Sequence, residues 1–209
     1  MRKRAKTNSP PAPKVRKGEE SAERILEIAA RLFSTHGYEA TTLRSIADVA
    51  GLKTASLYYH FKSKDELLDA VVATGLRKAV EAFQAAQAEL APDSTFEQRL
   101  HAAVRSHLKI MQSLGPTAQT SRQLLTQLSD AQRQKHLHMR TQYEQLWSDL
   151  LQESDHFQLC RPGLRLGIVR LFLLGAINWS TEWMDPKKES IETISTIATD
   201  FFLRGIVGK

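Results

Sequence analysis

Hydrogen-bonding and aromatic side chains crowd into one short stretch of this chain, from residue 53 to residue 60. The stretch contains Lys53, Thr54, Ser56, Tyr58, Tyr59 and His60, and it also includes Ala55, whose side chain is small. On a helix, the side chains at the amino end could approach base edges and thymine methyl groups in the DNA major groove. The tyrosines and the histidine could donate to phosphates or pack on sugars. The chemistry predicted for this stretch is therefore the binding of double-stranded DNA.

Three residues outside this stretch suit the same purpose. Lys64 and the backbone amides after Ser63 suit a phosphate at the start of a helix. Thr42 has the same position at the start of the preceding helix, so it is a cap, a phosphate contact or both. Arg44, near the start of the same helix, is a candidate to reach the DNA groove.

A short amphipathic helix must precede the polar stretch and position it. Its apolar residues recur at i, i+3, i+4 and i+7, and they are Leu43, Ile46, Ala47 and Ala50. Gly51 follows, and it can adopt the left-handed backbone that ends a helix. The pattern predicts a helix over residues 43–50 that turns at Gly51.

A second short helix and the start of a third follow the glycine. Thr54 is a plausible N-cap of the second helix, with Leu57 and Phe61 on its buried side. Ser63 and Glu66 form a candidate capping box for the third. This order is that of a helix-turn-helix, whose second helix enters the major groove. The alternative is a helical hairpin with no DNA role, although exposed tyrosines beside a histidine are expected at an interface.

The same region resembles the N-terminal domain of the tetracycline-repressor (TetR) family of one-component regulators, from Arg24 to Leu68. The matching positions are Phe33, Gly37-Tyr38, Thr42, Ile46-Ala47, Ala50-Gly51 and Leu57-Tyr58-Tyr59-His60-Phe61. The resemblance implies an all-helical homodimer with two DNA-binding heads and C-terminal ligand-binding domains. It also implies a repressor that binds a palindromic operator and is released by a small effector. At motif level it covers about a fifth of the chain.

The rest of the chain also predicts helices, without strand alternation or internal repeats. The fold class is therefore all-α, with about nine helices. We expect three parts: a basic disordered arm (1–19), a helix-turn-helix DNA-binding domain (20–66) and a helical ligand-binding and dimerisation domain (67–209). One short helix is expected to end near residue 128, between a Gly-Pro turn and a long helix that starts near residue 130.

Positive charge is concentrated at the amino terminus. Residues 1–17 carry seven lysines and arginines and no acid, whereas the whole chain has a net charge of +6. With three prolines inside it, this segment is expected to be disordered alone. It is either an arm that adds phosphate or minor-groove contacts, or a solvated leader with nonspecific affinity for polyanions.

Composition argues against secretion and membrane insertion. The charged leader lacks the apolar core of a signal peptide. The single Cys160 excludes an internal disulfide and suits a reducing compartment. The most hydrophobic segment, 164–183, still contains two arginines, an asparagine and a glutamate, so a buried or dimer-forming helix is expected. We expect a bacterial cytoplasmic protein that associates with the nucleoid through DNA.

Enzyme motifs are missing from the sequence. His136 and His138 are two residues apart, about 200° around a helix, so they cannot chelate one metal. No glycine-rich phosphate loop, cysteine-pair site or hydrolase serine elbow is present. We predict no catalysis, metal or resident cofactor, although carboxylates on separate helices would leave no local signature. A further alternative is a DNA-architectural protein whose C-terminal helices only dimerise.

The last two helices are the expected dimer surface. Residues 164–177 are apolar on nearly all sides, so one face should pack outside its own domain. The final helix has an apolar face with small residues at Ser195 and Gly205, and this face contains Ile191, Ile194, Ala198, Phe201 and Phe202. Two such helices from each chain would form a four-helix interface. The alternative is that both helices are ordinary core in a monomer.

Paired residues near the end of the hydrophobic helix are candidates for ligand binding. Asn178 and Glu182 are i, i+4 partners, as are Trp179 and Trp183, so each pair shares a face. The tryptophans could floor a pocket for a flat or acylated ligand, or equally cover the dimer seam. The N-W-x-x-x-W arrangement is similar to that in TetR members that respond to fatty-acyl or steroid-derived coenzyme A thioesters.

A coenzyme A effector would need cations and an acyl cavity. Arg170 is the candidate cation on the hydrophobic helix, and further arginines of the body are Arg122, Arg133, Arg140 and Arg165. Candidate acyl-lining residues are Met111, Leu125, Met139 and Tyr143, although methionine at helical spacing is more often plain core. A hydrophobic effector without coenzyme A remains the alternative.

Overall fold

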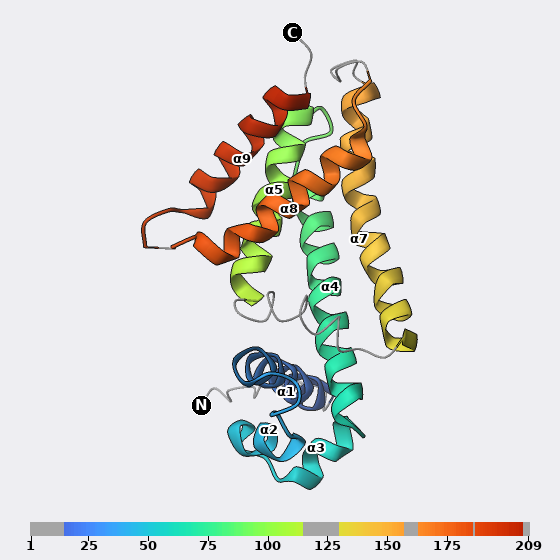
Figure 1. Cartoon of the computed structure of the whole chain (residues 1–209), viewed down its shortest axis with the longest axis vertical. Coiled ribbons are helices and arrows are strands. Elements are labelled where there is room, and N and C mark those ends of the chain that lie inside the picture. The colour runs from blue at the N-terminus through green and yellow to red at the C-terminus, as the bar shows by residue number, and fades with distance from the viewer. Residues whose placement is uncertain (1–14, 115–129, 157–162, 186, 207–209) are drawn as a thin grey trace, which may run out of the picture.

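The structure, a computed structural model of the chain, describes residues 15–114, 130–156, 163–185 and 187–206. These residues form eight helices and no strand (Figure 1), which confirms the all-α fold class. The helices are α1 (Val15–His36), α2 (Leu43–Ala50), α3 (Thr54–His60), α4 (Lys64–Ala88), α5 (Phe96–Leu114), α7 (Asp130–His156), α8 (Leu166–Trp183) and α9 (Ile191–Ile206). The helix expected to end near residue 128 and the first 14 residues of the basic arm lie outside the described residues. α1 begins inside the segment assigned to the arm.

The first three helices pack around one apolar core, which defines the head. Ile25, Phe33, Ile46 and Leu57 are fully or almost fully buried there. The same core continues past residue 66 into α4, where Leu67, Leu68, Val71 and Val72 belong to it. The first two turns of α4 therefore belong to the head, while the rest of this helix runs into the body (Figure 1).

Local hydrogen bonds set the ends of the head helices. The Thr42 hydroxyl accepts from the Ser45 amide at 3.0 Å, and the Ser45 hydroxyl accepts from the Thr42 amide at 3.1 Å, which completes a capping box. The Ser63 hydroxyl caps α4 by accepting from the Glu66 amide at 3.0 Å. The prediction for α3 is corrected: Thr54 is its first helical residue, and Lys53 is an N-cap without a side-chain hydrogen bond.

Gly51 ends α2 with a left-handed backbone, at φ 67°. A Cβ at this φ is disfavoured by about 1–2 kcal/mol. We therefore expect Gly51→Ala to lower the free energy of unfolding by that amount, as measured by urea denaturation. Gly167→Ala is the control, because Gly167 lies within α8 and a Cβ there meets no neighbour. Equal midpoints for the two variants would contradict the prediction.

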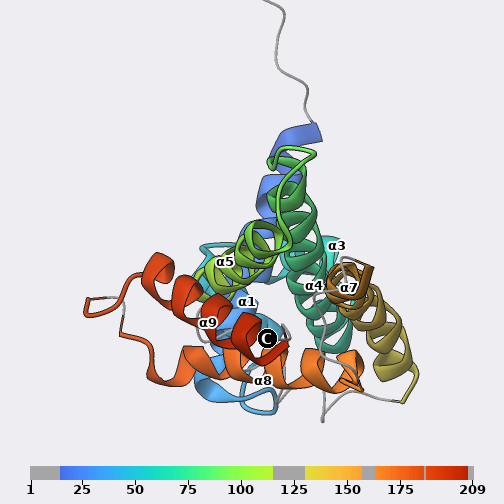
Figure 2. The same cartoon turned by 90° about the horizontal axis from the view of Figure 1, so that it is seen from above.

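The remaining helices form the body around a second core. Trp147 of α7 lies at its centre, fully buried, with its ring edge-on to Phe83 of α4 at 5.4 Å between centroids. Seen from above, α8 lies at the edge of the body with α9 beside it (Figure 2). None of the described helices is long and apolar enough to cross a membrane.

Candidate DNA interface and ligand cavity

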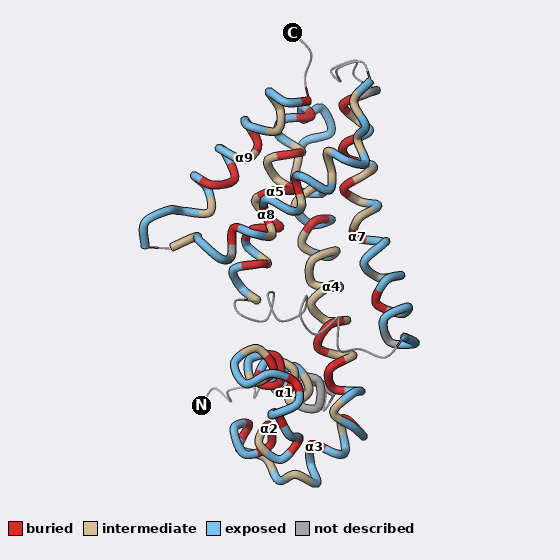
Figure 3. The backbone as a smooth tube through the Cα atoms, viewed as in Figure 1, coloured by how far each residue is buried: buried red, intermediate tan, exposed pale blue. Residues whose placement is uncertain are grey.

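α3 lies at the end of the molecule opposite the carboxyl terminus (Figures 1 and 3). Leu57 and Phe61 hold it on the head core, as predicted. Tyr59 is 88% exposed and Tyr58 is 52% exposed, which is unusual for large aromatic side chains. The exposed residues of this surface are Thr42, Arg44, Lys53, Ala55, Ser56, Tyr58 and Tyr59, while Thr54 and His60 are half-buried. The structure thus gathers these candidate DNA contacts at one end of the head.

Lys64 differs from the other candidates because the head itself holds its side chain. Its ammonium group donates to the Tyr38 carbonyl at 2.9 Å and lies 4.1 Å from the centre of the Tyr38 ring. The Tyr38 hydroxyl in turn donates to the Asp65 carboxylate. Burial raises the pKa of the Tyr38 hydroxyl well above its usual value, and the hydrogen bond to the Asp65 carboxylate is the second cause of this increase. These contacts join the α1–α2 connection to α4, and sequence patterns did not indicate them.

Removing the Tyr58 hydroxyl tests the phosphate role of α3. We expect Tyr58→Phe to weaken DNA binding about fivefold, the equivalent of about 1 kcal/mol for one hydrogen bond, without changing sequence preference. The measurement is fluorescence anisotropy at fixed salt on the DNA upstream of the protein's own gene and on variants of that site. A changed order of preference among the site variants would contradict a phosphate contact.

A cavity of about 790 Å³, partly open to solvent, lies among α4, α5, α7 and α8. This volume is within the usual range of small-molecule sites. Most of the wall is apolar, formed by Val72, Leu76, Ala79, Ile110, Met111, Leu114, Leu137, Leu171 and Leu174. The polar and charged residues of the wall are His107, Asn178, Arg133, His136, Arg140, Tyr143 and Glu144. We call this space the inner cavity.

Only some of the predicted ligand residues line the inner cavity. Met111, Tyr143 and Asn178 do so. Arg170 lies behind the wall, where its guanidinium group donates to the Ser148 hydroxyl at 2.7 Å and pairs with the Glu144 carboxylate at 3.2 Å. Leu125 lies outside the described residues, and the Met139 side chain is not among the side chains that the structure describes.

The two tryptophans of α8 do not line the inner cavity. Trp179 and Trp183 are 58% and 57% exposed, and Glu182 is exposed as well. Successive helical residues point about 100° apart, so when Asn178 faces inward its neighbour Trp179 must face elsewhere. In the described part of the chain, these side chains therefore belong to the outer surface of α8.

Three polar side chains meet inside the inner cavity, and we call them the polar cluster. The His107 ring lies between its partners: Nδ1 is 2.7 Å from the Tyr143 hydroxyl, and Nε2 is 3.2 Å from the Asn178 side-chain oxygen. Burial raises the pKa of the Tyr143 hydroxyl, so it stays a neutral group. Sequence reasoning missed His107, because the three residues come from three separate helices.

A close contact between a histidine and a carboxylate joins the α7 wall of the inner cavity to α4. His136 of α7 is buried in the cavity wall, and its Nε2 lies 2.5 Å from a carboxylate oxygen of Asp69. Asp69 is one helical turn beyond Asp65, the residue that accepts from Tyr38 in the head. The cavity wall and the head are thus joined to neighbouring turns of the same helix.

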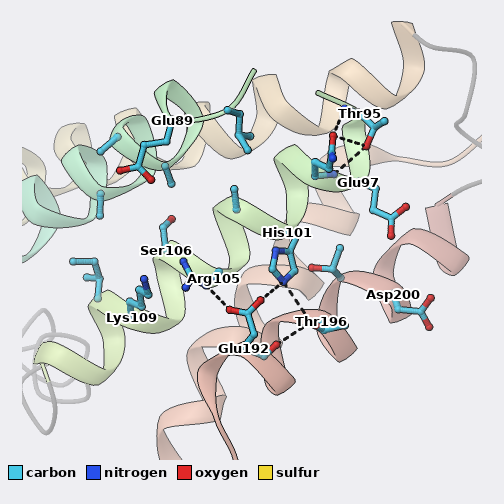
Figure 4. Close-up of a pocket in the computed structure, with 18 residues that line it drawn as sticks. Glu89, Thr95, Glu97, His101, Arg105, Ser106, Lys109, Glu192, Thr196 and Asp200 are labelled. Atoms are coloured by element: carbon cyan, nitrogen blue, oxygen red, sulfur yellow. Dashed lines mark hydrogen bonds and ion pairs between the residues drawn. The ribbon is translucent and has the colours of Figure 1, made fainter. Parts of the chain in front are cut away.

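A second, more open hollow of about 1080 Å³, the outer groove, lies among α4, α5 and α9 (Figure 4). Its central charges pair with one another: Arg105 lies 2.5 Å from the Glu192 carboxylate, and His101 lies 3.5 Å from the same group. These pairs hold α9 against α5. The groove is therefore a weaker candidate for an effector site than the inner cavity.

α8 and α9 also share an exposed apolar surface, which we call the α8/α9 face. Its large side chains are Ile168, Phe172, Trp179, Trp183, Ile197 and Phe201, between 41% and 71% exposed. The predicted α9 face is corrected in part. Ile194 is buried in the body core and Phe202 is half-buried against it, whereas Ile197 and Phe201 point outward. Exposed apolar surface of this kind makes the α8/α9 face a candidate interaction site.

Family comparisons agree with both parts of this architecture. Residues 25–71 match the family described as "Bacterial regulatory proteins, tetR family". Residues 93–206, more than half of the chain, match the family described as "Tetracyclin repressor-like, C-terminal domain". The first match covers the helix-turn-helix and the second covers the body helices α5 to α9.

Individual relatives are similar over most of their length. The HTH-type transcriptional repressor KstR2 of Mycobacterium tuberculosis is 29% identical over 165 residues, which cover 78% of this chain and 80% of the relative. The crystal structure of the regulator PfmR from Thermus thermophilus superposes with a TM-score of 0.75 at 28% identity, covering 87% of this chain and 97% of PfmR. The structure of M. tuberculosis KstR2, described as a ketosteroid transcriptional regulator, superposes with a TM-score of 0.76 at 24% identity. The superposition covers 95% of this chain and 98% of KstR2.

Proposed function

Because the chain belongs to the TetR family of bacterial transcriptional regulators, we propose that it is a repressor controlled by a small effector. The observation that carries this proposal is the inner cavity, which α4 lines with Val72, Leu76 and Ala79. The first turns of α4 belong to the head core. A molecule that fills the cavity can therefore act on the helix that packs against the DNA-binding head.

The DNA contacts proposed for the head follow from their chemistry. Lys53, Thr54, Ala55 and Ser56 approach base edges from the start of α3, with Arg44 beside them. The side chains assigned to the phosphate backbone are Thr42, Tyr58, Tyr59, His60 and Lys64. The basic residues before α1 add further phosphate contacts. The protein would act in the bacterial cytoplasm, on the nucleoid.

A homodimer through the α8/α9 face is the second part of the proposal. Phe172 and Phe201 are 70% and 71% exposed, and both border an apolar hollow between the two helices. Burial of this face against its copy would remove a large apolar surface from water. A two-fold axis would then present two heads to the two halves of a palindromic operator.

The proposed effector is an acyl- or steroid-coenzyme A thioester. The apolar wall of the inner cavity suits an acyl or ring system, and Arg133 and Arg140 provide cations on α7. Met111, Leu125, Met139, Tyr143 and Asn178 are the proposed body contacts. Arg170 is proposed behind the wall beside Glu144, and Trp179, Glu182 and Trp183 toward the dimer seam. The relative KstR2 of M. tuberculosis, described as a ketosteroid transcriptional regulator, supports this class. The alternative effector is a hydrophobic molecule without coenzyme A.

The proposed mechanism is an equilibrium between two spacings of the heads. An effector that binds more tightly to the state with the wrong spacing shifts the equilibrium toward that state and releases the dimer from its operator. The size of this shift is limited by the difference between the effector's affinities for the two states. A DNA-architectural protein would instead bind most sequences alike and ignore small molecules.

The test is fluorescence anisotropy of the protein on its own upstream DNA at fixed salt. Hexadecanoyl-coenzyme A and a steroid acyl-coenzyme A are titrated, with the matching free acids as controls. Release by thioesters alone supports the proposed effector class. Equal affinity for unrelated DNA, with no release by any compound, would favour the architectural alternative.

A further inference from the structure

The polar cluster interrupts an otherwise largely apolar part of the inner cavity. His107, Tyr143 and Asn178 come from α5, α7 and α8, and all three line the cavity. Resting on the proposed function, we infer that this cluster recognises an uncharged oxygen, a hydroxyl or a carbonyl, carried on the apolar part of the effector. The cluster would then determine which apolar molecules the regulator distinguishes.

The hydrogen-bond arrangement around His107 explains why either oxygen is suitable. In one arrangement the Tyr143 hydroxyl donates to Nδ1 of His107, and Nε2–H donates to the Asn178 oxygen. The Tyr143 oxygen can then accept from an effector hydroxyl. With the other histidine tautomer, the Asn178 amide turns so that its NH2 group donates to Nε2, and Nδ1–H donates to the Tyr143 oxygen. The Tyr143 hydroxyl can then turn to donate to an effector carbonyl. A neutral histidine supports both arrangements without any change in charge.

The surroundings of the cluster disfavour a charged effector group at this point. His107 is 5% exposed and Tyr143 is 7% exposed, so an ion placed there would lose most of its hydration. Glu144, the residue after Tyr143, also lines the cavity, and its carboxylate is already paired with Arg140 at 2.7 Å and Arg170 at 3.2 Å. The loss of hydration therefore disfavours a carboxylate beside the cluster, whereas a hydroxyl or carbonyl loses far less. The cluster therefore selects neutral oxygen over carboxylate.

The two arginines of the wall lie at different distances from the cluster: Arg140 is one turn before Tyr143 and is paired with Glu144 at 2.7 Å, whereas Arg133 lies farther away. Arg133 is ten residues before Tyr143 on α7, which places their backbones about 15 Å apart along the helix. An elongated effector can therefore carry an anionic group near one end of the cavity and a neutral oxygen near the other. The two recognition elements are separable, so the cluster can be tested with small probes that lack the anionic part.

Four fused-ring probes of one size test the inference on the full-length protein by isothermal titration calorimetry. They are decahydro-2-naphthol, its ketone, the hydrocarbon decahydronaphthalene and the carboxylate of decahydro-2-naphthoic acid. We expect the alcohol and the ketone to bind about tenfold more tightly than the hydrocarbon and the carboxylate, the effect of one well-made hydrogen bond.

Variants of the cluster remove that preference if the inference is correct. In Tyr143→Phe and in Asn178→Leu the oxygenated probes should bind within about twofold of the hydrocarbon. Ser154→Ala is the matched control, because it also removes one buried hydroxyl from α7, distant from the cavity, and it should keep the preference. Equal binding of all four probes, tightest binding of the carboxylate, no binding at all, or an unchanged preference in both cluster variants would overturn the inference.

Measuring DNA release by anisotropy in the same samples distinguishes failure of this inference from failure of the proposed function. If the alcohol and ketone bind through the cluster while hexadecanoyl- and steroid acyl-coenzyme A leave the operator complex intact, the cluster is upheld and the effector class is wrong. If thioesters release DNA while the four probes bind equally, the repressor stands and the cluster has no role in selection.

Discussion

Replacing Phe201 with glutamate is expected to convert the protein to a monomer and to lower operator affinity about a hundredfold. Phe201 is 71% exposed on α9 and lies on the α8/α9 face with Phe172. In the proposed dimer, Phe201→Glu would bury a charge without a partner, which costs about 3 kcal/mol or more, the equivalent of about a hundredfold in association. A monomer would also hold only one half-site of a palindrome.

Light scattering after size-exclusion chromatography measures the mass, and anisotropy measures operator affinity. Gln142→Glu is the control, because it adds the same charge at an exposed position of α7 that does not line the inner cavity. The control should remain dimeric and bind DNA as the wild type does. A Phe201→Glu protein that is still a dimer would rule out this face as the interface.

The second large effect is expected from Asp69→Ala, which should lower the free energy of unfolding by about 3 kcal/mol. The substitution leaves His136, 1% exposed in the cavity wall, without the carboxylate that lies 2.5 Å from its Nε2. Removal of one partner from a buried pair is costly because the other partner stays desolvated. The same change removes the polar contact between α7 and the head end of α4, so effector and DNA should also become less strongly coupled.

Urea denaturation gives the stability, and effector titration of the DNA complex gives the coupling. Glu81→Ala is a matched control on the same helix, because Glu81 pairs with Arg77 on the surface, where both side chains are more than half exposed. That exposed pair should contribute less than about 1 kcal/mol. Similar losses in the two variants would show that the buried pair has no special role.

Sequence alone determined the head of this protein, because its signals are local. The stripe from Leu43 to Ala50, the left-handed Gly51 and the Ser63 cap all act within one or two helical turns. The tyrosines of α3 could also be predicted to be exposed, since Leu57 and Phe61 already occupy the buried side of that helix. Where interacting residues lie within a few positions of one another, their spacing is enough to predict structure and chemistry.

Tertiary structure decided how the body helices are rotated about their axes. This rotation determines which side chains line the inner cavity. α8 is apolar on nearly every side, so its pattern did not distinguish the cavity-facing Asn178 from the outward-facing Trp179. In α9, packing against the body core turned Ile194 inward and left Phe201 outward. The polar cluster and the Asp69–His136 pair join residues that are dozens of positions apart. Such contacts depend on which helix faces meet, and no short-range pattern contains that information.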